Sequence, residues 1–135
     1  MSEGEAVHMK NVLLVDDDNI FNFLSTKLLQ QSGMVNEIHT AVNGEEALDL
    51  INNYYSGSSS LPDFILLDLN MPVMDGFAFL EAFKRLNLPR KENVRIIIVT
   101  SSQNPADMAR AKQMGITRYL SKPLSRESLL SALEV

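Results

Sequence analysis

The sequence contains no cysteine, no long apolar run and no dense cluster of basic residues. The lack of cysteine excludes disulfides, thiolate nucleophiles and thiolate metal ligands, so a metal ion would have to bind to oxygen or to one of the two histidines. Apolar runs such as IIIV at 96–99 are far shorter than the ~20 residues that span a bilayer, and the polar start MSEGEAVHMKN contains no signal-peptide segment. We therefore expect a soluble, cytoplasmic protein without a membrane partner.

The charge of the chain argues against nucleic acid as a partner. The sequence has 12 basic and 17 acidic residues, which gives a net charge of −5, and its densest basic stretch is PRKENVR at 89–95. A surface that binds DNA or RNA needs many lysines and arginines to contact phosphate groups. We therefore expect no direct contact with nucleic acid.

Strand-like apolar runs alternate with segments of helical periodicity along the chain. We predict strands and helices in turn at 11–16, 19–32, 35–40, 44–55, 63–68, 75–87, 94–100, 105–115, 117–121 and 125–135. This strict alternation predicts a parallel sheet with helices on both faces. The second strand is less continuously apolar than the first, third and fourth, so we expect it at an edge of the sheet. With 135 residues, 45% of them hydrophobic, the chain suffices for one core. We assign residues 1–9 to an N-terminal tail and 10–135 to a single domain.

Local signals agree with two of these helix boundaries. Asn43 followed by Glu46 predicts a capping box at the start of the second helix. Asn104 followed by Pro105 predicts an N-cap, with proline in the first turn, for the fourth.

Polar residues stand at the carboxyl ends of four predicted strands. Asp16 and Asp17 come at the end of the first strand, Asp68 ends the third, Thr100 ends the fourth and Lys122 follows the fifth. In an open parallel sheet, ligands bind beyond the carboxyl ends of the strands. We therefore expect these five side chains to converge on one edge of the sheet.

Three carboxylates at this edge would repel one another by roughly 3 kcal/mol per pair at ~5 Å and an effective dielectric of ~20. One lysine cannot neutralise them, so either a carboxyl group takes up a proton or a divalent cation binds. Mg²⁺ fits best, because it binds through one or two carboxylates and keeps several waters. The sequence therefore predicts a magnesium site, held directly by Asp17 and Asp68 and through water by Asp16.

The same residues suit the attack of a carboxylate on a phosphoryl group, because that reaction depends mainly on positioning and charge neutralisation. Asp68 would be the nucleophile. Mg²⁺, Lys122 and the Thr100 hydroxyl would each contact one phosphoryl oxygen.

Each residue also has a purely structural interpretation. Taken singly, Asp68 is more often a turn residue, Thr100 a hydroxyl that satisfies a loop amide, and Lys122 a solvated charge. Asp18 is left out of the site, since an aspartate at this position stabilises the start of the following helix. Only the combination of the remaining positions favours a functional site.

Four motifs, in this order, make the sequence resemble a response-regulator receiver domain of two-component signalling. They are LLVDDD at 13–18, LLDLNMPVMDG at 66–76, VTSS at 99–102 and YLSKP at 119–123. Within that family the chain resembles the stand-alone chemotaxis-type and phytochrome-associated regulators. The resemblance implies a doubly wound (βα)5 flavodoxin-like α/β sandwich, whose five parallel strands are ordered 2-1-3-4-5.

The resemblance also implies roles for individual residues. Asp68 would accept phosphate from the phosphohistidine of a sensor histidine kinase or phosphotransfer protein, and Asn70 would add its backbone carbonyl to the Mg²⁺ ligands. Thr100 and Tyr119 would form a switch pair. The Lys122–Pro123 peptide bond would be cis.

The output implied by the resemblance is a changed surface on the fourth helix, fifth strand and fifth helix. This surface would bind an unknown downstream protein or, in a homodimer formed on phosphorylation, a second copy of the chain. We expect it to carry Met108, Ala111, Lys112, Met114 and Arg118, although some methionines of an ordinary solvated helix would face the core. Such a domain catalyses only its own phosphorylation and dephosphorylation, so we do not expect an enzyme.

Two other functions share part of this pattern. A phosphatase of the haloacid dehalogenase type uses the same kinds of residue, but its nucleophile comes first in an Asp-x-Asp pair, whereas Asn70 stands here in place of the second aspartate. A pseudo-receiver that only binds partners usually lacks the phosphoacceptor or the lysine, and both Asp68 and Lys122 are present. The sequence does not separate a stand-alone receiver, which we favour, from one that belongs to a longer protein.

Overall fold

The computed structural model describes residues 9–55 and 61–133 and confirms the predicted alternation of strands and helices. Its strands are β1 (Lys10–Val15), β2 (Val35–Ala41), β3 (Phe64–Leu67), β4 (Arg95–Thr100) and β5 (Arg118–Ser121). Its α-helices are α1 (Asn19–Ser32), α2 (Gly44–Leu50), α3 (Gly76–Arg85), α4 (Pro105–Gln113) and α5 (Arg126–Ala132). Of the predicted N-terminal tail, residues 1–8 lie outside the described residues. Within the described ranges, no helix has the length and apolar character needed to cross a membrane.

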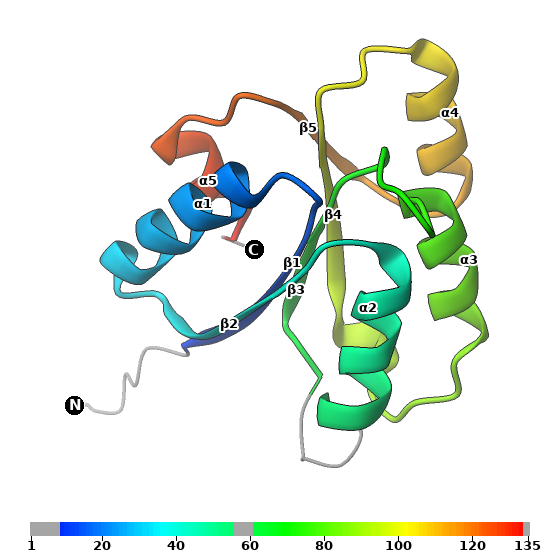
Figure 1. The fold of residues 1–135 in the computed structure, drawn as a ribbon, viewed down its shortest axis with the longest axis horizontal. Coiled ribbons are helices and arrows are strands. Elements are labelled where there is room, and N and C mark those ends of the chain that lie inside the picture. The colour runs from blue at the N-terminus through cyan, green and yellow to red at the C-terminus, as the bar shows by residue number, and fades with distance from the viewer. Residues whose placement is uncertain (1–8, 56–60, 134–135) are drawn as a thin grey trace.

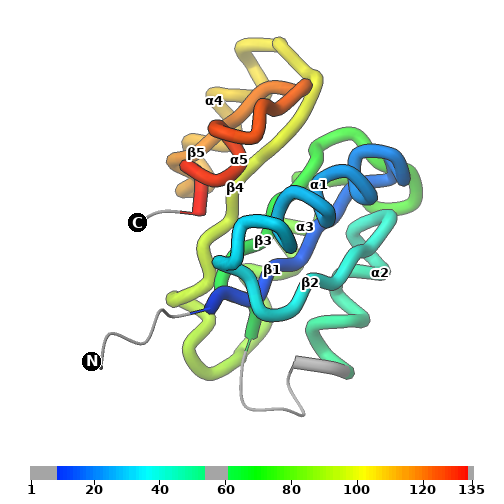
Figure 2. The backbone as a smooth tube through the Cα atoms, turned by 90° about the vertical axis from the view of Figure 1, so that its left-hand side faces the viewer, coloured from blue at the N-terminus to red at the C-terminus, as the bar shows by residue number. Residues whose placement is uncertain are grey.

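The five strands form one parallel sheet ordered β2-β1-β3-β4-β5, which confirms the predicted flavodoxin-like fold. Figure 1 shows α1 and α5 on one face of the sheet and α2, α3 and α4 on the other. In Figure 2 the molecule is turned so that α1 and α5 lie toward the viewer. Strand β2, which mixes polar and apolar residues, lies at an edge of the sheet, as predicted.

Alternate residues of the central strands enter two separate cores. On β1, Leu13 and Val15 pack in the core shared with α2 and α3, whereas Val12 and Leu14 pack in the core shared with α1 and α5. Because successive side chains of a strand point to opposite faces, a strand covered on both sides is apolar throughout. This double burial explains the continuous apolar runs that the sequence shows.

Of the five predicted helices, only the first has the observed bounds. The third and fourth, predicted at 75–87 and 105–115, span Gly76–Arg85 and Pro105–Gln113. The second helix, predicted at 44–55, is α-helical only over Gly44–Leu50 and continues as a π-helical turn at Ile51–Tyr55. The fifth helix, predicted from residue 125, begins at Arg126 because Ser125 is its N-cap and accepts a hydrogen bond from the Ser128 N–H. Apolar periodicity alone distinguishes neither an α-helix from a π-turn nor a cap from a first turn.

Both predicted caps are present, one of them with a shifted partner. Asn43 Oδ1 accepts a hydrogen bond from the Glu46 N–H at 2.8 Å, but Glu46 Oε1 accepts from the Val42 N–H at 2.9 Å rather than from Asn43 itself. Asn104 Oδ1 accepts from the Ala106 N–H at 2.9 Å at the start of α4. These caps fix the helix starts that follow β2 and β4.

Candidate functional site

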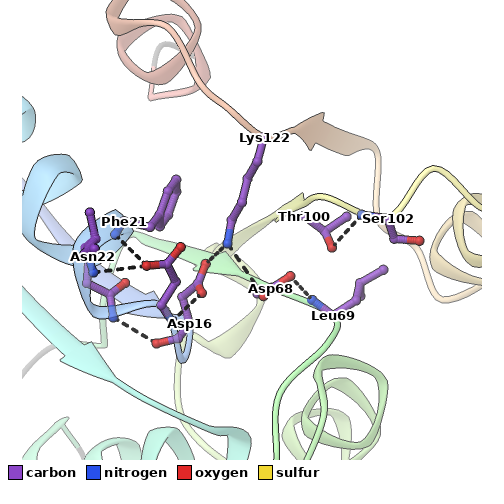
Figure 3. Close-up of polar contacts among 10 residues, drawn as sticks. Asp16, Phe21, Asn22, Asp68, Leu69, Thr100, Ser102 and Lys122 are labelled. Carbon is purple, nitrogen blue, oxygen red and sulfur yellow. Dashed lines mark hydrogen bonds and ion pairs between the residues drawn. The ribbon is translucent and has the colours of Figure 1, made fainter.

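The carboxyl ends of the strands carry the predicted site residues. Asp16 directly follows β1, Asp68 directly follows β3, Thr100 is the last residue of β4 and Lys122 directly follows β5. Figure 3 shows these four side chains gathered at one edge of the sheet. Asp17 adds a third carboxylate within 4.8 Å of the other two. The structure therefore brings together all five residues that we expected at this edge.

Lys122 lies between two of the acids. Its Nζ is 2.6 Å from Oδ2 of Asp16 and 3.7 Å from Oδ2 of Asp68, and it lies 4.4 Å from the centroid of the Phe21 ring (Figure 3). The side chain is only 16% exposed. The two carboxylates and the aromatic face attract the ammonium, so this lysine is not an ordinary solvated charge.

Asp16 is buried and held by its neighbours. Its Oδ1 accepts a hydrogen bond from the Asp18 N–H at 2.9 Å, and its backbone carbonyl accepts one from Asn22 Nδ2 at 2.8 Å. Burial raises the pKa of Asp16 above its ordinary value, and the charge of Asp68 acts in the same direction, while the contacts with Lys122 and Asp18 oppose both. Asp16 therefore needs a neighbouring cation to stay ionised at low cost. Asp18 itself is the N-cap of α1, as its exclusion from the site predicted.

Asp68 is fixed at the base of a tight loop. It is 6% exposed, and its Oδ1 accepts a hydrogen bond from the Leu69 N–H at 2.8 Å. The loop returns over it at Gly76, whose N–H donates to the Leu69 carbonyl at 3.0 Å. A side chain at Gly76 would clash with the backbone carbonyl oxygen of Asp68. The loop thus sets the position of the carboxylate.

The three carboxylates fit the predicted metal ion. One oxygen each of Asp16, Asp17 and Asp68 lies within 4.8 Å of the others. Together with Lys122 these acids leave two net negative charges, which a divalent cation would cancel. Hard oxygen ligands suit Mg²⁺. Asn70 is exposed in the same loop, and its carbonyl as a further ligand stays a prediction.

Ser102 connects the two predicted switch residues. Its N–H donates to Oγ1 of the buried Thr100 at 3.2 Å, and its carbonyl accepts a hydrogen bond from the Tyr119 hydroxyl at 3.5 Å. Its own hydroxyl donates to Oδ2 of Asp107 in α4 at 2.7 Å. Burial raises the pKa of Tyr119, so its phenol stays protonated and able to donate. Thr100 and Tyr119 are therefore linked to each other and to α4 through one residue.

The Lys122–Pro123 peptide bond is cis, as the resemblance implied. The Lys122 N–H donates to the Thr100 carbonyl at 2.9 Å, which joins the end of β5 to the end of β4. The lysine side chain points back toward the acids (Figure 3). The hydrogen bond thus holds the backbone of Lys122 beside the end of β4.

The surface of α4 agrees with the prediction only in part. Met108 is 49% exposed and Lys112 is also exposed, whereas Met114 packs partly against the core. Ala111 is 1% exposed, so its assignment to an interaction surface is wrong. The reason is helical geometry, because the face of α4 that carries Ala111 is turned toward the sheet.

Sequence reasoning missed three residues near the site: Phe21, Asn22 and Ser102. Phe21 borders the lysine, and Asn22 donates to the backbone of the buried acid from the first turn of α1. Asn22 shares the buried face of α1 with Ser25 and Leu29, so a polar residue at a core-facing position was the available signal. Ser102 gave no signal beyond its place two residues after the switch threonine.

Comparison with known proteins places this geometry in a family. A family model for the response regulator receiver domain matches residues 12–134. Among curated proteins, the chain is 33% identical over 123 residues to the probable methanogenesis regulatory protein FilR2 of Methanothrix harundinacea, covering 91% of this chain and 78% of that protein. It is 32% identical to part of the sensor histidine kinase CheAY of Helicobacter pylori, covering 99% of this chain but only 16% of the kinase.

A solved structure shows the same likeness. The two-component response regulator from Cytophaga hutchinsonii matches with a TM-score of 0.81 and 32% sequence identity, covering 92% of this chain and 93% of that one. The likeness thus covers nearly the whole length of both chains.

Proposed function

This chain belongs to the response regulator receiver domain family, and we propose that it accepts phosphate on Asp68 from the phosphohistidine of a sensor histidine kinase or phosphotransfer protein. One observation carries the proposal. The carboxylate of Asp68 lies 3.7 Å from the Lys122 ammonium, inside a group of three acids at the carboxyl edge of the sheet. The proposed nucleophile, the lysine ammonium and the carboxylates suited to a metal ion therefore lie next to one another.

The proposed reaction moves a phosphoryl group from nitrogen to oxygen. A carboxylate oxygen of Asp68 attacks phosphorus, the P–N bond breaks, and the donor imidazole, which carries a proton on its other ring nitrogen, keeps the bonding electrons and leaves as a neutral ring. The products are an acyl phosphate on Asp68 and a free histidine. Because the Leu69 N–H holds Oδ1, the carboxylate is oriented before the donor arrives.

Two side chains would stabilise the transferred group. Lys122 would contact one phosphoryl oxygen, since only a small shift separates its present position from a group attached to Asp68. The Thr100 hydroxyl would donate to another, since its oxygen at present accepts a hydrogen bond from the Ser102 N–H and its proton is left to donate. Both contacts become stronger as negative charge gathers on the phosphoryl oxygens.

Mg²⁺, when bound, would supply further positive charge beside the phosphoryl oxygens. Asp17 and Asp68 would hold it directly, Asp16 through water and Asn70 through its carbonyl. The clustering of the three carboxylates supports this assignment.

The signal would leave through the loop after β4. A displacement of Thr100 toward the phosphoryl group would pull on its hydrogen bond with Ser102, and the contacts of Ser102 with Tyr119 and Asp107 would carry the movement to β5 and α4. The changed surface of α4, β5 and α5 would then bind a downstream protein or a second copy of the chain.

The chain is similar to part of a protein named a sensor histidine kinase, and this similarity supports a partner of that class. Since Asp68 is itself the acceptor, the chain would promote only its own phosphorylation and dephosphorylation and would act on no separate substrate. The cytoplasmic location expected from the sequence stays a prediction.

The test is labelling with acetyl phosphate, a small donor that needs no partner, followed by intact-mass measurement with Mg²⁺ or with a chelator. We expect one phosphoryl group with Mg²⁺ and almost none with the chelator. Asp17→Asn should abolish most of the labelling, whereas Asp49→Asn, a change at an exposed acid of α2, should leave it intact. Equal labelling with and without Mg²⁺ would contradict the proposed site.

A further inference from the structure

A cavity of about 290 Å³ lies at the opposite end of the sheet from the acids. It is lined by the first residues of three neighbouring strands, namely Phe64 of β3, Arg95 of β4 and Arg118 of β5. None of the residues assigned to phosphate transfer lines it. The cavity is therefore separate from the phosphate site, although Met114 and Arg118 of the expected output surface line it.

One part of the wall of this cavity is apolar. Leu80 and Phe83 contribute from α3, Ile96 from β4, and Met114 and Ile116 from the turn between α4 and β5. Apolar side chains combined with a few polar groups in one concavity are typical of sites that enclose a small organic molecule.

The rim is positively charged. Lys84, Lys91, Arg95 and Arg118 all line the cavity, and no aspartate or glutamate of the described ranges does so. These are four of the 12 basic residues in a chain whose net charge is −5. A local excess of positive charge on an acidic protein attracts anions to this one place.

Two of these cations are explained by the fold. Lys91 Nζ donates to the carbonyls of Phe83, Lys84 and Leu86 at 3.2, 2.7 and 2.7 Å, and thereby caps the end of α3. Such contacts fix the position of a lysine head without removing its charge. Arg118 is held in a similar way, by the carbonyls of Ser131 and Ala132 in α5.

The other two cations have no such role. Lys84 and Arg95 are exposed, and in the described part of the chain neither side chain forms an ion pair or a hydrogen bond. Helix capping therefore accounts for two of the four cations, and the other two remain available to pair with a ligand.

We propose that this cavity binds a small organic anion with an apolar body, such as an aromatic or aliphatic carboxylate. The apolar body of the ligand would pack against the apolar part of the wall, and its charged group would face Arg95 and Lys84 at the rim. An inorganic anion would leave the walls in contact with water, and a neutral molecule would leave the cations unpaired. The composition of the cavity thus favours a ligand that has both parts.

The proposal is tested with two probes that differ in charge. The anion 8-anilinonaphthalene-1-sulfonate and its uncharged analogue N-phenyl-1-naphthylamine share the same ring system, and both fluoresce when they leave water. We expect the sulfonate to form a one-to-one complex with the native protein, about tenfold tighter than the neutral analogue. In NMR spectra, the sulfonate should shift amide resonances at 94–97 and 114–118.

Two charge-reversal variants test whether the preference for the sulfonate comes from the cations at the cavity rim. Arg95→Glu should weaken sulfonate binding about tenfold and hardly change binding of the neutral analogue. Lys112→Glu makes the same change in net charge at an exposed position of α4 outside the cavity, and should have little effect. If Arg95→Glu does not fold, as judged by circular dichroism, Lys84→Glu takes its place.

Three outcomes would overturn the proposal, and a fourth would refute its charged part. They are the absence of a one-to-one complex, equal losses in Arg95→Glu and Lys112→Glu, and resonance shifts centred on the exposed Ile20 and Phe23 of α1. Equal affinity for the two probes would likewise refute the role of the cationic rim.

Discussion

Lys122 forms its shortest ion pair with Asp16, at 2.6 Å between Nζ and Oδ2, and not with the proposed phosphoacceptor. Both side chains are largely buried. A buried carboxylate that lacks a cation is costly, because neither water nor an opposite charge compensates it. Lys122 therefore stabilises the fold before phosphate arrives, in addition to its proposed contact with the phosphoryl group.

Replacing this lysine should destabilise the protein. We expect Lys122→Met to lower the free energy of unfolding by about 2 kcal/mol, because it leaves Asp16 buried and unpaired. Adding Asp16→Asn to this variant should restore most of the loss. Urea unfolding of the two single variants and the double variant measures the coupling. Additive effects of the two substitutions would mean that the pair does not stabilise the fold.

The loop after Asp68 should tolerate no side chain at Gly76. A Cβ there would meet the backbone carbonyl of Asp68 and lie 2.8 Å from the Leu69 Cα, so we expect Gly76→Ala to cost about 3 kcal/mol. Gly44→Ala is the matched control, since Gly44 also begins a helix but its Cβ would mainly meet the flexible Met74 side chain, at 2.7 Å. Thermal or urea unfolding compares the two. A larger loss for Gly44→Ala would contradict this account of the loop.

Val73 lies in the same loop and has a left-handed backbone, with φ of 70°. A β-branched residue is disfavoured in this region, whereas asparagine is tolerated. Its side chain is 76% exposed, so little packing is lost on substitution. We expect Val73→Asn to raise the free energy of unfolding by about 1 kcal/mol.

Arg90 offers a comparison for Val73, because its φ is 63° but its side chain is not β-branched. Arg90→Asn should therefore stabilise the protein less. Chemical denaturation of both variants gives the two values, and a loss of stability in Val73→Asn would show that the valine makes contacts that outweigh its strain.

The fold could be predicted because strands that are buried on both faces of a sheet appear in the sequence as continuous apolar runs. Val12–Val15 and Phe64–Leu67 are apolar at every position, as strands covered on both faces must be. The site could be predicted because parallel strands bring their carboxyl ends to one edge. These two rules placed Asp68 and Lys122 together without any structural information.

Other features depend on distances and rotations that the sequence does not contain. Whether Lys122 pairs more closely with Asp16 or with Asp68 depends on side-chain positions that differ by about 1 Å, which no periodicity specifies. Ala111 looks equally suited to a core or to a contact surface, and only the rotation of α4 about its axis decides. The role of Ser102 depends on how the loop after β4 folds.

Ser102 should transmit phosphorylation to α4. In the native sequence, phosphorylation should change amide exchange along 105–122 more than along α2, because the ligand favours one arrangement of the β4–α4 loop. Ser102→Ala removes the hydrogen bond to Asp107 and should reduce the change in α4 without preventing phosphorylation. Ser101→Ala, at the exposed neighbour, should behave like the native sequence. Equal changes in α2 and α4 would leave the proposed output surface without support.

The position of the label tests the central claim most directly. After treatment with acetyl phosphate and Mg²⁺, peptide mass spectrometry should find one phosphoryl group, on Asp68, that hydroxylamine removes, because an acyl phosphate is cleaved by nucleophiles whereas a serine phosphate is not. Asp68→Asn should gain no label. Asp75→Asn, which keeps an N-cap for α3 in the same loop, should be labelled normally. A phosphoryl group that persists in Asp68→Asn, or that resists hydroxylamine in the native sequence, would contradict the account.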